Sequence, residues 1–174
     1  MSLRVNMVST GNASCHVPAL VNVLTDAIHD GASLGFLLPF TNSTALGYWN
    51  SVLEELELNQ RQLWIAMVDD ELIGTVQLNP NPKENGWSRA EVQKLIVHTK
   101  WRNQGVASNL MATLENHARQ MGRKLVYLDT QVGSAAEWFY LQQGYKKAGE
   151  IPDYASSPNG ELHGTAIYYK QLMS

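Results

Sequence analysis

The sequence predicts an α/β fold, α+β in some schemes, with a mixed central sheet of about seven strands flanked by about four helices. Apolar runs of strand length alternate with segments of helical periodicity, and several helical segments are followed by Gly. The expected order of elements is β-α-α-β-β-β-α-β-α-β-β, which places helices on both faces of the sheet. A chain of 174 residues with 44% hydrophobic content can bury a full core, so we expect one domain over residues 1–174.

The first half of the chain predicts three strands and two helices. Gly31 closes the first helical pattern, as is typical of a left-handed helix cap. Leu46 is among the apolar residues expected to face inward from the second helix. An acidic turn at 69–71 between two apolar runs indicates a hairpin. The expected elements are a strand at 4–8, a helix from Val17, a helix from Ser43 or Thr44, and strands at 63–68 and 72–78.

The second half predicts four strands and two helices. Gly122 and Gly144 each follow a helical pattern. The turn-rich segment 152–160 is expected to be a loop between the last two strands. The expected elements are strands at 90–97, 125–129, 145–151 and 164–172, and helices at 106–121 and 135–143.

The segment from Arg102 to Ala107, Arg-Asn-Gln-Gly-Val-Ala, lies between the strand at 90–97 and the following helix. The first N–H groups of a helix have no partner within it, and the helix dipole adds positive potential at this end. Gly105 lets the backbone approach a ligand closely, and Ala107 keeps the first turn slim. The pattern predicts an anion site suited to a pyrophosphate.

With residues 95–101 before it, this loop resembles motif A of the GNAT family of N-acetyltransferases, written (Arg/Gln)-x-x-Gly-x-(Gly/Ala). The resemblance implies the GNAT fold, an N-acetyltransferase activity and acetyl-CoA as co-substrate. Asn103 and Ala107 replace glycines that are common in this motif. The coenzyme-binding residues that the resemblance implies are Ile96, Val97, Arg102, Asn103, Gln104, Gly105, Val106, Ala107 and Ser108.

Other segments are similar to the tabtoxin-resistance group within this family. They lie at 31–36, 89–95, 128–130, 136–140, 149–160 and 165–170. This resemblance implies transfer to the amine of a small molecule, such as an amino-acid-like compound, a toxin or an antibiotic. It places Ser33, Phe36, Asp153 and Tyr154 in the acceptor site. Gly133 and Ser134 stand where many members have an Asn that contacts the pantetheine arm.

Amine acetylation requires a base for the amine proton, and two carboxylates are candidates. Glu91 lies in an apolar strand and Asp129 ends another, so partial burial would raise the pKa of each toward the working range. Their counterparts in the resembling enzymes are assigned this role. Alternatively, Glu91 pairs with Lys94 or Arg89, and Asp129 caps a turn.

Tyr140 is the candidate general acid for the departing thiolate, because a phenol is protonated at neutral pH. Packing beside Phe139 is the structural alternative. Cys15 is the single cysteine, and a ping-pong mechanism would require it to be an activated thiol. We expect Cys15 to be inert and the amine to attack directly in a ternary complex.

The net charge of −3 argues against nucleic acid as a partner, and no apolar run is long enough to cross a membrane. The N-terminus lacks a signal-peptide pattern and the histidines show no metal spacing, so we expect a cytoplasmic protein without a metal. A homodimer is left open. Two other functions compete: a catalytically silent acyl-CoA sensor, and a regulatory module that binds another phosphate ligand.

Overall fold

The computed structural model describes residues 2–172, which form seven strands and four α-helices in the predicted order. The expected fold class is therefore confirmed. In chain order the elements are β1 (Leu3–Met7), α1 (Ala13–His29), α2 (Asn42–Glu57), β2 (Gln62–Val68), β3 (Glu71–Pro80), β4 (Arg89–Val97), α3 (Val106–Gln120), β5 (Leu125–Gln131), α4 (Ala135–Gln142), β6 (Lys146–Ser156) and β7 (Leu162–Gln171). Short 3₁₀ turns lie at Glu84–Gly86 and Thr99–Trp101.

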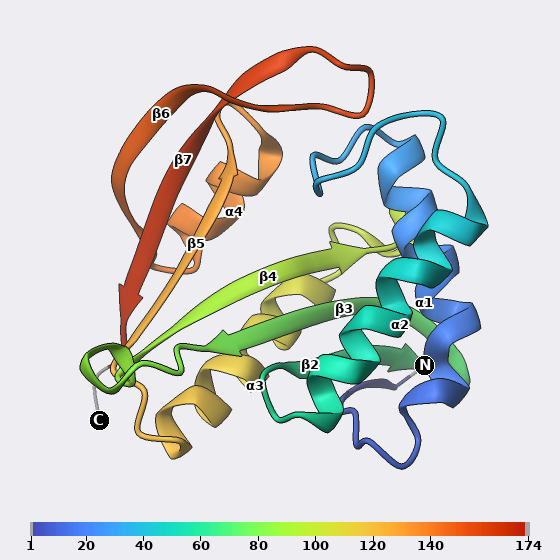
Figure 1. Cartoon of the computed structure of the whole chain (residues 1–174), viewed down its shortest axis with the longest axis horizontal. Helices are drawn as coiled ribbons and strands as arrows, with labels where there is room; N and C mark the ends of the chain where they lie inside the picture. Colours follow the sequence, from blue (N-terminus) through green and yellow to red (C-terminus); the bar gives the residue numbers. More distant parts are fainter. Residues whose placement is uncertain (1, 173–174) are drawn as a thin grey trace.

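The strands form one sheet in the order β1-β2-β3-β4-β5-β7-β6. β4 and β5 run parallel and all other neighbours are antiparallel. The parallel pairing covers Arg89–Glu91 against Leu125–Tyr127. Beyond it the two strands diverge, as Figure 1 shows from their meeting point at lower left. The sheet therefore opens into a V between β4 and β5.

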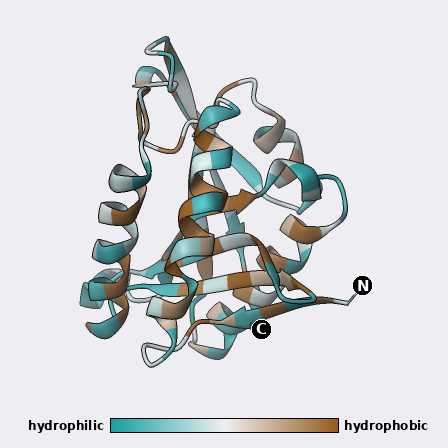
Figure 2. Cartoon of the chain, turned by 90° about the vertical axis from the view of Figure 1, so that its right-hand side faces the viewer, coloured by the Kyte–Doolittle hydropathy of each residue, from teal (hydrophilic) through white to brown (hydrophobic). Residues whose placement is uncertain are grey.

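Helices cover both faces of the β1–β4 half of the sheet. On one face, α1 and α2 bury residues such as Leu24 and Trp49 against Leu63 of β2. On the other face, α3 packs Leu110 against residues such as Ile73 of β3. The helices in Figure 2 carry alternating hydrophobic and hydrophilic segments, as expected for helices with one face on a sheet. No helix within residues 2–172 is long and apolar enough to span a membrane.

Two details of the helices differ from the sequence prediction. Helix α1 begins at Ala13, before the expected Val17, so Pro18 lies inside the helix rather than in its first turn. Helix α2 begins at Asn42, and the Thr41 side chain accepts a hydrogen bond from the backbone N–H of Thr44 as a cap. The buried stripe of α2 consists of Ala45, Trp49, Val52 and Leu56. Leu46 lies outside this stripe and is 45% exposed, so the inward prediction for Leu46 is wrong.

The predicted loop at 152–160 is largely a strand, because β6 continues to Ser156. The pairing of β6 with β7 is interrupted between Ile151 and Ala155, where Asp153 has a φ of 48°. An interruption of this kind accommodates Pro152, which has no N–H to donate to the ladder. The turn-forming composition therefore produces a bulge within the strand.

A second bulge lies in β4. Thr75 pairs with Ile96 and Gln77 pairs with Gln93, so β4 has one more residue than β3 over this stretch. Lys94 lies in the extra segment with a left-handed φ of 50°. Its ammonium group lies 5.7 Å from the ring centroid of Tyr48 on α2. The bulge therefore turns Lys94 toward the face that α1 and α2 cover.

Candidate active site

The start of α3 presents an uncapped row of backbone N–H groups. Gly105 precedes the helix with a left-handed φ of 78°, and no side chain caps it. The N–H of Asn109 donates a hydrogen bond to the Gly105 carbonyl at 3.1 Å. Among residues 2–172, no acceptor forms a hydrogen bond with the backbone N–H groups of residues 103–108. The structure therefore has an uncapped helix start at this loop, and unpaired N–H groups of this kind suit an anion.

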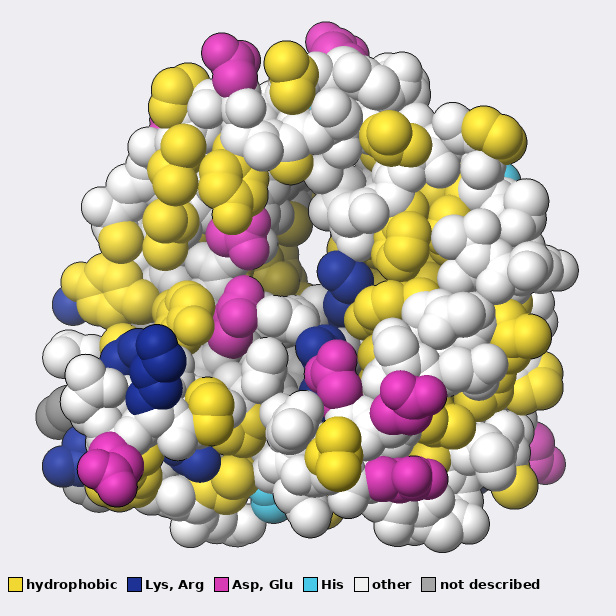
Figure 3. Space-filling model, viewed as in Figure 1, with side chains coloured by type: hydrophobic (Ala, Val, Ile, Leu, Met, Phe, Trp, Pro, Cys, Tyr) yellow, Lys and Arg dark blue, Asp and Glu magenta, His cyan; other side chains and the backbone are white. Residues whose placement is uncertain are grey.

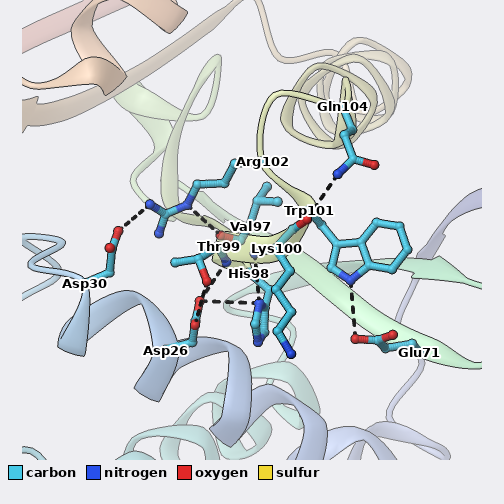
Figure 4. Close-up of polar contacts among 10 residues, drawn as sticks. All are labelled: Asp26, Asp30, Glu71, Val97, His98, Thr99, Lys100, Trp101, Arg102 and Gln104. Atoms are coloured by element: carbon cyan, nitrogen blue, oxygen red, sulfur yellow. Dashed lines mark hydrogen bonds and ion pairs between the residues drawn. The ribbon is translucent and has the colours of Figure 1, made fainter.

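Helix α1 fixes the segment that leads into this loop (Figure 4). The Asp26 carboxylate accepts hydrogen bonds from the Thr99 N–H at 2.8 Å and from the Thr99 hydroxyl at 2.9 Å. Nδ1 of His98 lies 3.6 Å from the same carboxylate. Asp30, directly after α1, pairs with Arg102. The last turn of α1 and the residue that follows it thus hold both ends of the 98–102 segment.

Two residues of the predicted coenzyme site, Arg102 and Gln104, have side chains that make internal hydrogen bonds. Arg102 Nε donates to the Val97 carbonyl at 3.1 Å, and its guanidinium group pairs with Asp30. Gln104 Nε2 donates to the Lys100 carbonyl at 3.1 Å. Figure 4 shows both side chains lying along the loop. The structure therefore offers the loop backbone, rather than these two side chains, to an anion.

Ile96 and Val97 lie at the end of β4, past the last residue that pairs with β5. On their other side they pair with β3, through Thr75 and Gly74. Their edge toward β5 is therefore open along the V. This is the position expected for residues that offer main-chain groups to an extended ligand arm.

A pocket of about 160 Å³ lies on the β5 side of the V. It brings together both predicted carboxylates and one predicted acceptor residue, Tyr154. Figure 3 shows a hollow on this face, with Asp or Glu side chains on its left and Lys or Arg side chains on its right. The lining residues are Glu91, Tyr127, Leu128, Asp129, Ile151, Tyr154, Thr165 and Ile167.

The two carboxylates have different surroundings. Glu91 is half-buried, and within residues 2–172 its carboxylate makes no hydrogen bond or ion pair, so the alternative pairing with Lys94 or Arg89 is not formed. Asp129 accepts a hydrogen bond from the Thr165 hydroxyl at 2.9 Å rather than capping a turn. Asp129 is exposed because β5 has already left β4 at this point, so its predicted partial burial is wrong.

Two tyrosines lie beside these carboxylates. Burial, and then the charge of Glu91, raises the pKa of Tyr127. Tyr140 is only 7% exposed, and its ring contacts Phe139 at 5.3 Å and Tyr145 at 5.6 Å between centroids. Burial, and then the charge of Asp129, raises the pKa of the Tyr140 phenol. Tyr140 is thus a packed tyrosine near Asp129, outside the set that lines the pocket.

The predicted acceptor residues lie in the α1–α2 connection and near the end of β6. Tyr154 lines the pocket, whereas Asp153 lies at the β6 bulge. Ser33 and Phe36 lie in the α1–α2 connection, where Phe36 packs against Tyr48 at 5.5 Å between ring centroids. The N–H of Leu38 in that connection donates to the Pro158 carbonyl in the β6–β7 turn at 2.8 Å. Figure 1 shows these two segments approaching each other at the top.

Sequence reasoning missed Tyr127 and Thr165 as pocket residues and Asp26 as a support of the loop. Tyr127 alternates with the buried Val126 and Leu128, which could have placed it on the same face as Asp129. Asp26 and Thr99 are 73 positions apart, and no local pattern links them.

Cys15 lies in the first turn of α1, at the opposite end of the helix from the segment that contacts the loop, and it is exposed. The sequence predicts this helix from Val17, after Cys15, and the earlier start of α1 places Cys15 in the helix. Among the described residues, no group of three or more His, Cys, Asp or Glu could hold a metal ion.

The sequence model described as "Acetyltransferase (GNAT) family" matches residues 33–145, which include the loop and both carboxylates. The chain belongs to the acetyltransferase (GNAT) family. Its curated relatives are also named N-acetyltransferases. An aminoalkylphosphonate N-acetyltransferase of Salmonella typhimurium is 33% identical over 48% of this chain and 56% of its own length. Human N-acetyltransferase 8B is 32% identical over 61% of this chain and 48% of its own length. The chain thus matches about half of the length of these relatives.

Solved structures share the complete fold. An N-acetyltransferase from Staphylococcus aureus Mu50 superimposes with a TM-score of 0.80 over 99% of this chain and 100% of its own, at 15% identity. The protein yncA from Salmonella typhimurium, solved with its cofactor acetyl-CoA, gives a TM-score of 0.77 over 100% of this chain and 96% of its own, at 12% identity. At these identities the likeness shows the GNAT fold alone.

Asp26→Ala tests the support of the loop by α1. The change removes the acceptor of two Thr99 hydrogen bonds, so we expect a loss of about 1–3 kcal/mol in unfolding free energy. The amide of Thr99 should also exchange faster with solvent, because its N–H loses its partner. Denaturant unfolding and amide hydrogen exchange measure these effects. Asp70→Ala, in the exposed β2–β3 turn, is the control. Unchanged exchange at Thr99 would contradict the assignment.

Proposed function

We propose that this chain is an acetyl-CoA-dependent N-acetyltransferase that acts on the amine of a small molecule. The observation that carries the proposal is the opening of the sheet between β4 and β5. It has the uncapped start of α3 at its wide end and Glu91 at its closed end. One catalytic domain over residues 1–174, acting by direct attack of the amine in a ternary complex, is part of the proposal.

The backbone of the loop fits the coenzyme. Pyrophosphate needs several converging donors, and the N–H groups of Gln104, Gly105, Val106, Ala107 and Ser108 supply them with the positive end of the α3 dipole. Ile96 and Val97 would meet the pantetheine arm along the open edge of β4. Bound acetyl-CoA supplies the acetyl group as an activated thioester.

Glu91 and Asp129 would take the proton of the acceptor amine, directly or through water. Both carboxylates line one pocket, and Glu91 has no competing partner within the described residues. As the new nitrogen–carbon bond forms and the carbon–sulfur bond breaks, this proton passes to a carboxylate. Tyr140 would return a proton to the departing thiolate, because its raised pKa keeps the phenol protonated.

The acceptor belongs between the α1–α2 connection and the β6–β7 hairpin. Tyr154 lines the pocket from one side, while Ser33, Phe36 and Asp153 would complete the acceptor site from the segments that meet over it. The relative named as an aminoalkylphosphonate N-acetyltransferase and the similarity to tabtoxin-resistance enzymes both support a small amine. Antibiotic or toxin resistance is one role that such a site could serve.

Gly105→Val tests the placement of the pyrophosphate. A β-branched residue is strained at a φ of 78°, so the loop must rearrange and its N–H groups lose their convergence. We expect acetyl-CoA affinity, measured by calorimetry, to fall by roughly tenfold or more. Gly160→Val imposes similar strain at the β6–β7 turn, at a φ of 87°, and should leave affinity unchanged. Equal affinity in a folded Gly105→Val variant would remove this loop from the coenzyme site.

Glu91→Gln and Asp129→Asn test the proton acceptors. Each change keeps the shape of the side chain and removes its basicity, so turnover should fall by about 10²- to 10⁴-fold for the dominant base, with an altered acid limb of the pH profile. Glu54→Gln, on the exposed side of α2, is the control. The measurement is thiol release with a panel of amines. Wild-type rates and pH profiles in both variants would mean that the base lies elsewhere. Tight acetyl-CoA binding without turnover on any amine would favour the silent sensor.

Tyr140→Phe separates catalysis from packing, because it removes the hydroxyl and keeps the ring. We expect a folded protein with turnover lowered on the order of 10- to 1000-fold. The pKa of Tyr140 is raised, so it should add no alkaline limb below its ordinary value of about 10. Tyr169→Phe is the control. Normal turnover in a folded Tyr140→Phe variant would leave this residue a packing role only.

A further inference from the structure

Lys94 is a basic side chain in an unusual backbone position. A left-handed φ of 50° is uncommon for a residue with a long side chain and persists where the surrounding structure fixes it. Here the β4 bulge fixes it, between the pairs of Gln93 and Ile96 with β3. The bulge directs the side chain toward Tyr48 and into the half of the molecule that holds the acceptor cleft. In a regular strand this position would face the opposite side from Gln93.

The ammonium group of Lys94 is sheltered but has no anionic partner. A Cβ atom at Gly35 would lie 4.0 Å from Nζ, so the α1–α2 connection passes directly beside it. The ring of Tyr48 lies on another side at 5.7 Å. Within residues 2–172, Nζ makes no hydrogen bond and no ion pair. A half-buried charge without a partner is unfavourable in the absence of ligand.

The neighbouring guanidinium group of Arg61 does not share this property. Its Nε lies 2.5 Å from the Glu55 carboxylate, and its Nη1 donates to Gln93 at 2.8 Å and also to Gln77. The guanidinium group of Arg61 is therefore already bound by side chains of the protein. Of the two basic groups, Lys94 is the one available to a ligand.

Lys94 interacts electrostatically with the carboxylates of Glu91 and Asp129 across the cleft. Burial, and then the charge of Arg61, lowers the pKa of Lys94, whereas the charges of Asp129 and Glu91 raise it. The carboxylates line the β5 side of the cleft, and Lys94 lies outside that lining, on the α2 side. Figure 3 shows the same separation of acidic and basic side chains around the hollow. The cleft thus has a negative wall and a positive wall.

We propose that Lys94 is an anion subsite of the acceptor cleft, and that the acceptor is a small amine carrying a carboxylate or phosphonate group. The amine would lie toward Glu91 and Asp129, and the anionic group would bind the Lys94 ammonium beneath the Gly35 segment. A charge-assisted hydrogen bond in this sheltered place would orient the acceptor. This inference rests on the proposed function, because it assigns the acceptor of the same transfer.

The test compares acceptors with and without an anionic group. Small amino acids, their carboxamides and 1-aminoalkylphosphonates are assayed by thiol release with wild type, Lys94→Met, Lys94→Arg and the exposed-loop control Lys83→Met. We expect Lys94→Met to lower kcat/KM for anionic acceptors on the order of 10- to 100-fold, mainly through KM, and to leave the carboxamides nearly unchanged. Lys94→Arg should recover part of the loss. The carboxylate and phosphonate arms show which anion fits.

Equal effects on anionic and neutral acceptors, or no effect, would overturn the anion subsite while leaving the transferase intact. The ¹³Cε resonance of Lys94, assigned by its absence in Lys94→Arg, gives a readout independent of turnover and of the fold of Lys94→Met. A saturable shift of this resonance with an amino acid or aminoalkylphosphonate, and none with the carboxamide, supports the subsite even if no amine is acetylated. If no amine is acetylated and the resonance does not move, the subsite is rejected together with the proposed function.

Discussion

The end of the parallel pairing between β4 and β5 is the constraint on which the site depends. Three residue pairs, from Arg89–Leu125 to Glu91–Tyr127, hold the strands together before they separate. Every strand on either side of this junction is antiparallel, so the sheet behaves as two halves joined at one corner. The separation leaves backbone of β4 without a strand partner on one side. It also leaves Asp129 uncovered and creates the pocket that Glu91 closes.

Helix α1 links the parts of the site that this opening keeps apart. Its last turn holds the segment before α3 through Asp26, and Asp30 follows with a bond to Arg102. The chain then continues directly into the connection that passes Lys94 and reaches the β6–β7 turn at Pro158. One continuous stretch therefore supports the loop before α3, passes beside Lys94 and joins the two halves of the sheet across its open side. Displacement of α1 would disturb all three features together.

Local patterns predicted the elements and the uncapped start of α3 well, because periodicity, glycine stops and the residues before a helix are short-range properties. These patterns failed where the direction of a side chain depends on contacts between elements. Leu46 lies outside the stripe that α2 buries, and the bulge that turns Lys94 toward α2 depends on pairing with β3. The hydrogen-bond and ion-pair partners of Arg102 could not be predicted from the sequence either, because Asp30 becomes its neighbour only when α1 packs against the loop. Glu91 and Asp129 could be selected as candidates, but their unequal exposure follows from the divergence of two strands.

The central claim is that the open edge of β4 and the start of α3 form one continuous coenzyme site. Titration of ¹⁵N-labelled protein with coenzyme A, followed by amide chemical shifts, tests it most directly. The account predicts saturable shifts concentrated at residues 103–108, whose N–H groups have no acceptor within residues 2–172, and at Ile96 and Val97 along the open edge. Saturable binding that shifts amides elsewhere and leaves both of these segments unmoved would contradict it.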